Sequence, residues 1–271
     1  MSSDKVAAFA GTLAEFYDRY LVPLIFASYA EVVADRVKAL LPRSVLETAA
    51  GTGVVTEALV RILPTDVTIT ATDLNEPMIE RGKVRPGMER VTWQQADAMK
   101  LPFPDGSFDM IVCQFGVMFF SDKLASLKES FRVLRPGGTY LFVLWDDYDN
   151  MSNSPVWIAA QTVADMLGRN PHSLVSPAYF DEPTICADLA AAGFRDVKIN
   201  RIARTARAAS ARDAAVITVQ GSLLRTAIET ADPSRLDEAT KAVEQAMLAR
   251  FGEGPVEGET KALIVTTTKP Q

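Results

Sequence analysis

The sequence predicts an α/β protein with a parallel sheet and a helical cap, and three observations support this. Short apolar runs rich in Val, Ile and Thr alternate with helical patterns, which is typical of βαβ units. The chain of 271 residues is long enough to bury a large core. Hydrophobic residues make up 48% and charged residues 23% of the chain, as in ordinary globular proteins.

Turn and breaker residues mark the first βαβ unit. A strand over 44–49 follows Pro42, and Gly51 and Gly53 then turn the chain into a helix that stops at Pro64. This order of strand, glycine turn and helix places backbone N–H groups at the carboxyl edge of the sheet, where anions and nucleotides bind.

The remaining strands and helices follow in alternation. Asn75 can cap a helix that has Pro77 in its first turn, and Asp181 can cap a later one that closes at Gly193. We expect strands over 44–49, 67–73, 91–97, 108–115, 139–145, 194–202 and 262–268. We expect the later helices over about 122–134, 181–193, 211–229 and 232–250, and we expect the segment over about 154–168 to belong to a cap.

No internal repeat, low-complexity tract or long linker divides the sequence, so a single domain over 1–271 is expected. The core of this domain is expected over about 29–148, 181–206 and 256–271. The cap is expected over about 1–28, 149–180 and 207–255.

Charge and composition argue against several classes of protein. Lys and Arg total 28 against 34 for Asp and Glu, and the resulting net charge of −6 disfavours a nucleic acid partner. No apolar run approaches the roughly 18 residues of a membrane-spanning helix, and acidic residues interrupt any secretory pattern near the N-terminus, so we expect a cytoplasmic protein. Cys113 and Cys186 lie far apart in apolar contexts, which favours buried thiols over a disulfide or a metal site.

The residues around the glycine turn narrow the choice of ligand. A dinucleotide-binding turn would have a third glycine where Thr56 stands, and a phosphate-binding loop would have a lysine. Glu47, near the end of the first strand, needs a cation that a phosphate ligand cannot supply. S-adenosylmethionine has an ammonium for Glu47, a carboxylate for the helix N-terminus and a ribose for the acid of the next strand.

That second acid is Asp73, which lies at the end of the second strand and can accept hydrogen bonds from both ribose hydroxyls. Its distance from Gly53 also suits NAD. Asp97, after the third strand, is within plausible reach of an adenine amino group, and Leu74 and Met78 can sandwich the adenine ring.

Four motifs in order closely resemble the class I S-adenosylmethionine-dependent methyltransferases. They are ETAAGTG, ATDLNEPMI, ADAMKLPFPDGSFD and RVLRPGG, between residues 44 and 145. The nearest branch is the small-molecule type that includes ubiquinone and menaquinone biosynthesis enzymes. The resemblance implies a doubly wound, mostly parallel, seven-stranded Rossmann-like sheet with an antiparallel last strand.

The resemblance also implies roles for the residues of these motifs. Glu47 and the turn at residues 51–53 would hold the methionine portion, and Asp73 and Leu74 the ribose and adenine. Asp97 and Ala98 would contact the adenine edge, and Gln114 and Phe115 would line the passage to the sulfonium. The complete set expected to bind the cofactor is Glu47, Ala49, Gly51, Thr52, Gly53, Asp73, Leu74, Met78, Asp97, Ala98, Gln114 and Phe115.

The expected reaction is methyl transfer to an oxygen, nitrogen or carbon of a small, mostly apolar molecule, by in-line displacement under a helical lid. Tyr17, Tyr20 and Trp145 are candidates to contact this acceptor. A catalytic base is optional, and Tyr17, Tyr20 and His172 are the only weak candidates for one. An NAD-dependent oxidoreductase and a non-catalytic S-adenosylmethionine-binding module remain as alternatives, and the sequence does not indicate an oligomeric state.

Overall fold

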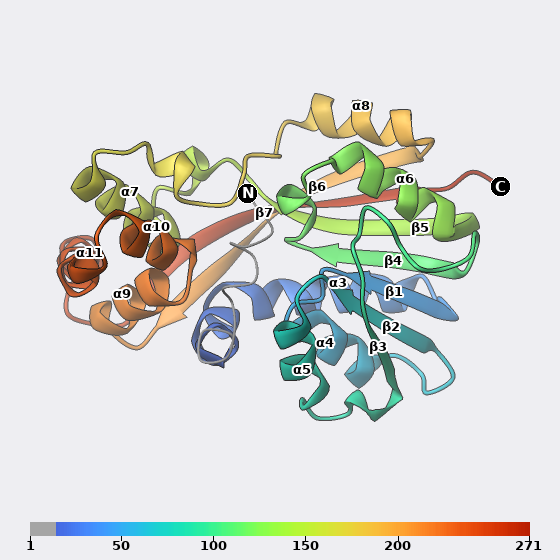
Figure 1. The fold of residues 1–271 in the computed structure, drawn as a ribbon, viewed down its shortest axis with the longest axis horizontal. Coiled ribbons are helices and arrows are strands. Elements are labelled where there is room, and N and C mark those ends of the chain that lie inside the picture. Colours follow the sequence, from blue (N-terminus) through green and yellow to red (C-terminus); the bar gives the residue numbers. More distant parts are fainter. Residues whose placement is uncertain (1–14) are drawn as a thin grey trace.

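The computed structural model describes residues 15–271, which form a mixed sheet of seven strands flanked by helices (Figure 1). The strands lie in the order β3-β2-β1-β4-β5-β7-β6, in which β1 to β5 pair in parallel and β7 runs antiparallel between β5 and β6. This confirms the predicted sheet with its antiparallel last strand. The strands are β1 (Ser44–Thr48), β2 (Thr68–Asp73), β3 (Val91–Gln95), β4 (Phe108–Gln114), β5 (Leu134–Trp145), β6 (Arg195–Ala208) and β7 (Val256–Thr268).

Helices cover the sheet on both sides. Figure 1 shows α6 and α8 on one side and α3, α4 and α5 on the other. The bounds of these helices are α3 (Ala27–Ala39), α4 (Val54–Ile62), α5 (Glu76–Lys83), α6 (Lys123–Val133) and α8 (Glu182–Ala192).

A second group of helices lies beyond the carboxyl ends of the parallel strands (Figure 1). It is carried on the far ends of β6 and β7 and consists of α7 (Pro155–Leu167), α9 (Ala211–Gln220), α10 (Leu223–Ala231) and α11 (Leu236–Phe251). A π-helix, η1 (Tyr17–Phe26), contacts α3, α9 and β6. Residues 1–14, which were expected to belong to the cap, lie outside the described residues.

The buried apolar side chains form two clusters. One lies around the sheet and includes Val45, Ile111 and Leu263, each fully buried. The other joins the cap helices to η1 and to the far ends of β6 and β7, and includes Val243 and Leu21. The predicted division into core and cap stays a prediction, since shared packing alone does not define a domain boundary.

Four local expectations need correction. The strands expected over 194–202 and 262–268 are longer, because β6 and β7 continue beyond the sheet as a two-stranded ribbon that pairs up to Ala208 and Val256. The helix expected over 211–229 is divided into α9 and α10, because the chain breaks at Gly221 and the Ser222 hydroxyl accepts a hydrogen bond from the Leu224 N–H, starting a new helix.

The third correction concerns Asn75, which occupies the N-cap position of α5 but makes no capping hydrogen bond with its side chain. Its N–H instead donates to Asp73 Oδ1 at 2.8 Å. Asp181, by contrast, caps α8 as expected by accepting from the Thr184 N–H. Of the two cysteines, Cys113 is buried as expected, whereas Cys186 is exposed on α8.

Candidate functional site

The chain between β1 and α4 makes a tight turn over residues 49–53. Ala49, Gly51 and Gly53 all have positive φ angles, of 52°, 55° and 81°. A side chain on Gly53 would place its Cβ 2.8 Å from the Trp93 ring, so both the backbone conformation and the packing require glycine there. The Gly51 N–H donates to Asp73 Oδ2 at 2.8 Å, which ties the turn to the end of β2.

Glu47 and Asp73 lie on neighbouring strands at the same edge of the sheet. β1 and β2 are parallel and in register, with Glu47 opposite Ala71 and Thr48 opposite Thr72. Glu47 is 2% exposed and Asp73 is 9% exposed. This places two carboxyl groups beside the glycine turn, as the sequence predicts.

The environment of Glu47 disfavours its charge. Thr56 donates its hydroxyl to Glu47 Oε2 at 2.6 Å, so the residue that replaces a third glycine serves this carboxyl. Burial raises the pKa of Glu47 to about 8, although the Thr56 hydrogen bond opposes the shift. Burial also raises the pKa of Asp73, against the opposing hydrogen bonds from the Asn75 and Gly51 N–H groups. A cation at Glu47 would remove this cost.

The residues expected around the adenine differ in accessibility. Leu74 is 53% exposed directly after β2, while Met78 is 8% exposed on α5. Asp97 follows β3 and accepts the Met99 N–H at 2.8 Å with Oδ1, and Ala98 lies inside that turn. The structure therefore places these four residues after β2 and β3, at the edge that carries Asp73.

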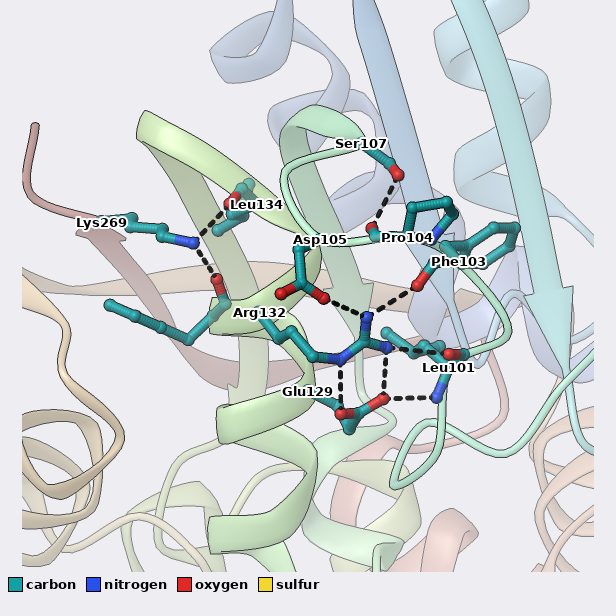
Figure 2. Close-up of polar contacts among 10 residues, drawn as sticks. Leu101, Phe103, Pro104, Asp105, Ser107, Glu129, Arg132, Leu134 and Lys269 are labelled. Atoms are coloured by element: carbon teal, nitrogen blue, oxygen red, sulfur yellow. Dashed lines mark hydrogen bonds and ion pairs between the residues drawn. The ribbon is translucent and has the colours of Figure 1, made fainter.

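Arg132 of α6 fixes the loop that follows Asp97 (Figure 2). Its guanidinium donates to the carbonyl oxygens of Leu101 and Phe103 at 2.9 and 2.7 Å and pairs with Asp105 and Glu129. Glu129 in turn accepts the Leu101 N–H at 2.8 Å. The LPFPDGS segment and the RVLRPGG segment are therefore one connected structure.

Gln114 and Phe115 end β4 beside an aromatic cluster. Phe115 has a φ of 55° and stacks on Trp145, with ring centroids 3.9 Å apart. Phe26 and Tyr29 contact both of these rings. Gln114 Nε2 donates to the Phe26 carbonyl at 3.3 Å, whereas its Oε1 is buried without a partner.

The candidate acceptor and base residues are dispersed. Tyr17 is partly buried, and burial together with the charges of Asp73 and Asp18 raises its pKa. The next residue, Asp18, accepts a hydrogen bond from Thr52 of the glycine turn. Tyr20 is 38% exposed, and its ring packs on Phe16.

The structure places His172 in the cap, with its ring against Trp157 and its Nε2 3.4 Å from Asp149 Oδ1. Both contact residues, Trp157 and Asp149, belong to the segment expected to form the cap and not to the glycine turn. Among residues 15–271, no group of three or more His, Cys, Asp or Glu side chains is arranged to hold a metal ion.

Sequence reasoning missed an ionic contact between η1 and the glycine turn. Asp18 accepts the Thr52 hydroxyl at 2.8 Å with Oδ1 and Arg81 Nε at 2.8 Å with Oδ2, and it also pairs with Arg85. Arg85 binds Glu57 as well and donates to the Thr52 carbonyl at 2.5 Å. The only signal in the sequence is the spacing of Arg81 and Arg85, one helical turn apart after the second strand.

The sheet order and the antiparallel β7 define the fold of the class I S-adenosylmethionine-dependent methyltransferases. The profile of the ubiE/COQ5 methyltransferase family matches residues 6–154, and the chain belongs to this family. The cofactor of the class is S-adenosylmethionine, as the sequence predicts.

Three known proteins illustrate the similarity. The ubiquinone/menaquinone biosynthesis C-methyltransferase UbiE of Geotalea daltonii is 33% identical over 142 residues, 50% of this chain and 60% of that protein. The demethylmenaquinone methyltransferase of Staphylococcus aureus is 43% identical over 94 residues, 34% of this chain and 39% of that protein. The solved YcgJ protein of Bacillus subtilis shares the fold, with a TM-score of 0.57 and 19% identity over 90% of this chain and 99% of YcgJ. The chain spans only 36% of the first curated relatives it matches.

Proposed function

We propose that this chain transfers the methyl group of S-adenosylmethionine to an oxygen, nitrogen or carbon of a small, mostly apolar molecule, by in-line displacement under the helical cap. The observation that carries this proposal is the pair of carboxyl groups on neighbouring strands, Glu47 and Asp73, on either side of the turn that begins α4. One adenosyl group with its methionine portion can reach both.

Each part of the cofactor then has a chemically suitable partner. The Glu47 carboxylate binds the ammonium, and the first N–H groups of α4 bind the methionine carboxylate at the positive end of that helix. Asp73 accepts from the ribose hydroxyls with the lone pairs that Gly51 and Asn75 leave free. Leu74 and Met78 enclose the adenine, and Asp97, Ala98, Gln114 and Phe115 complete the expected set.

Alignment does most of the catalytic work in this proposal. Transfer from the sulfonium disperses a positive charge, so an apolar site that holds the reacting atoms in line favours it without a dedicated base. Positioning alone can contribute about 7 to 11 kcal/mol when reacting atoms are held about 3 to 3.5 Å apart. Trp145 and Phe115 supply apolar surface at the carboxyl ends of β5 and β4, and Tyr17 is the candidate base that lies near the turn.

The acceptor that we propose is a small, mostly apolar molecule. The names of the two curated relatives support a carbon of a quinone precursor as the first candidate. The family profile ends at residue 154, however, before the cap helices α7, α9, α10 and α11 begin. The cap is the element expected to contact the acceptor. The match to the family profile therefore does not assign the acceptor specificity of this chain.

The other expectations on partners and location belong to the same proposal. We infer a cytoplasmic protein with a small-molecule acceptor and no nucleic acid partner, supported by the net charge of −6. No helix within residues 15–271 has the length and apolar character needed to cross a bilayer. The NAD-dependent oxidoreductase is not supported, since the chain belongs to a methyltransferase family.

Calorimetric titration tests the cofactor assignment. The wild-type protein and the Asp73→Asn variant are each titrated with S-adenosylhomocysteine and with NAD. Wild-type protein should bind S-adenosylhomocysteine and not NAD, and Asp73→Asn should bind about tenfold or more weakly, since each hydrogen bond to a charged group contributes about 1.5 to 3 kcal/mol. Asp66→Asn, at an exposed acid just before β2, is the matched control and should bind normally. Normal binding by Asp73→Asn would remove the ribose assignment.

Turnover separates an enzyme from a non-catalytic binding module. Labelled S-adenosylmethionine is offered with a panel of phenols, amines and quinols, and transfer of label to one of them is the expected result. Tight cofactor binding without transfer to any small molecule, together with transfer to a macromolecule, would contradict the proposed acceptor class.

A further inference from the structure

The two carboxyl groups of the cofactor turn are covered in this structure. Glu47 is 2% and Asp73 is 9% exposed, whereas Leu74, the residue after Asp73, is 53% exposed. Both carboxyl groups are therefore closed to solvent, while the neighbouring Leu74 side chain is open to it. A ligand of adenosyl size can touch both carboxylates only after a covering segment has moved.

The segment at this position is η1 (Tyr17–Phe26). Asp18, itself 8% exposed, accepts from the hydroxyl of Thr52, which is a residue of the cofactor turn. The neighbouring Tyr17 lies close enough to Asp73 for the charge of that carboxyl to act on its hydroxyl. The segment thus contacts the glycine turn directly, through the hydrogen bond between Asp18 and Thr52.

A buried ionic contact fastens η1 in this place. The two oxygens of Asp18 are shared among Thr52, Arg81 and Arg85, and the side chain of Arg85 is only 15% exposed. Arg85 also donates to the Thr52 carbonyl, so the same guanidinium holds both the segment and the turn. We call Asp18, Thr52, Arg81 and Arg85 the latch.

The backbone of η1 is suited to rearrangement. A run of ten residues in π-helical conformation is rare, and this one includes Pro23, which cannot donate a backbone hydrogen bond. The Ala27 N–H donates to the Val22 carbonyl, five residues back. The following helix α3 is anchored in the core by Tyr29 and Val33, both fully buried, so movement of η1 would pivot near Phe26.

We propose that η1 is a gate that competes with the cofactor for the glycine turn, and that the latch holds this gate closed. The inference rests on the proposed function, because it takes S-adenosylmethionine as the ligand of the turn. When the binding-competent state is only partly populated, the apparent dissociation constant is the intrinsic one divided by the open fraction. Weakening the latch therefore increases both the association rate and the affinity.

The test is association of S-adenosylhomocysteine with the full chain, by stopped-flow fluorescence and calorimetry. Asp18→Asn keeps an acceptor for the Thr52 hydroxyl but loses the charge that pairs with Arg81 and Arg85. Because Arg85 retains Glu57 and the Thr52 carbonyl, the variant is expected to fold. It should bind about three- to tenfold faster and correspondingly tighter than wild type.

Two further variants keep the result interpretable. Arg81→Gln removes one latch partner whose side chain is 38% exposed, and should shift the rate in the same direction by a smaller factor even if Asp18→Asn fails to fold. Asp35→Asn, an exposed acid on α3, should bind like wild type.

Other roles for Asp18 and η1 predict different changes in the binding of S-adenosylhomocysteine. Weaker binding with faster dissociation would mean that Asp18 completes the cofactor-bound site, and an unchanged association rate would mean that η1 does not limit access; either result overturns the gate. Absence of binding in wild type and variants alike would overturn the proposed function itself, and the gate with it.

Discussion

Glu47 has an acidic side chain in a place that provides little support for its charge. It is 2% exposed, and its hydrogen-bonding partner is the Thr56 hydroxyl, a neutral group. Burial raises its pKa to about 8, so in the closed structure the carboxyl retains its proton at neutral pH. Binding an ammonium there would require the proton to leave, which couples cofactor binding to ionisation of a buried acid.

This raised pKa predicts how stability depends on pH. Between the ordinary pKa of 4.5 and about 8, folded Glu47 holds a proton that unfolded Glu47 has released. The free energy of unfolding should therefore fall as pH rises through this window, with Glu47 contributing up to about 1.4 kcal/mol per pH unit. Urea unfolding at a series of pH values from roughly 5 to 9 measures this dependence of the free energy of unfolding on pH.

Glu47→Gln is the control for this measurement. It removes the titrating group but keeps an acceptor for Thr56, so its stability should decline less over the same pH range. Asp73, whose pKa burial also raises, is present in both proteins, so the difference between the two curves reports Glu47 together with its coupling to Asp73. Parallel curves would show that the buried carboxyl is ionised throughout.

At the scale of elements, Trp93 of β3 joins two helices to the edge of the sheet. A Cβ on Gly82 of α5 would lie 2.4 Å from the Trp93 ring, and one on Gly53 before α4 would lie 2.8 Å from it. Glycine inside a helix usually costs about 1 kcal/mol relative to alanine. Here the close approach of the ring reverses that preference, because a Cβ at Gly82 would overlap the indole ring.

Gly82→Ala should therefore destabilise the protein by about 1 to 3 kcal/mol, the usual cost of overpacking. Gly254→Ala is the matched control, since no atom lies within 4 Å of a Cβ there. Denaturant unfolding compares the two variants. A gain in stability for Gly82→Ala would mean that Trp93 moves freely.

The contacts of Arg132 with the loop after Asp97 are expected to stabilise the protein. Arg132→Met leaves two loop carbonyls and Glu129 without their shared cation, and should cost about 1.5 to 3 kcal/mol of unfolding free energy. Arg225→Met, which breaks an exposed i,i+4 pair with Glu229, should cost about 0.5 kcal/mol or less. Equal losses would show that the loop does not depend on Arg132.

The sequence predicts the elements well where their determinants are local. The glycine turn, the capped start of α8 and the five parallel strands are each marked by neighbouring residues. The extension of β6 and β7 is decided by pairing between segments far apart in the chain, and the Asp18 latch joins residues 34 to 67 positions apart. No local pattern signals such contacts. The break at Gly221, by contrast, has a local signal in Gly221 and the capping residue Ser222, which the single helix expected over 211–229 did not take into account.

At the scale of the whole molecule, the two apolar clusters are joined by the ribbon of β6 and β7 and by Phe26 and Trp145, which pack against both clusters. Val265 and Leu263 of β7 belong to the sheet cluster, whereas Val256 at the other end of the same strand belongs to the cap cluster. The strands thus connect the site edge to the helices that would cover an acceptor. Leu21 and Ile25 of η1 also pack in the cap cluster, so opening of the gate would disturb the cap.

This organisation predicts that bound S-adenosylhomocysteine protects the sheet and the cap unequally against hydrogen exchange. At about 100 times its dissociation constant, S-adenosylhomocysteine adds about 2.7 kcal/mol to any unfolding event that destroys its site. Amides of β1, β2 and α4 form that site and should gain this full protection in hydrogen exchange. Amides of α10 and α11 lie in the cap cluster and should gain clearly less, because the cap can open on its own while the glycine turn stays intact. An equal gain in all these elements would mean that sheet and cap unfold as one cooperative unit, and no gain in β1 and β2 would place the ligand elsewhere.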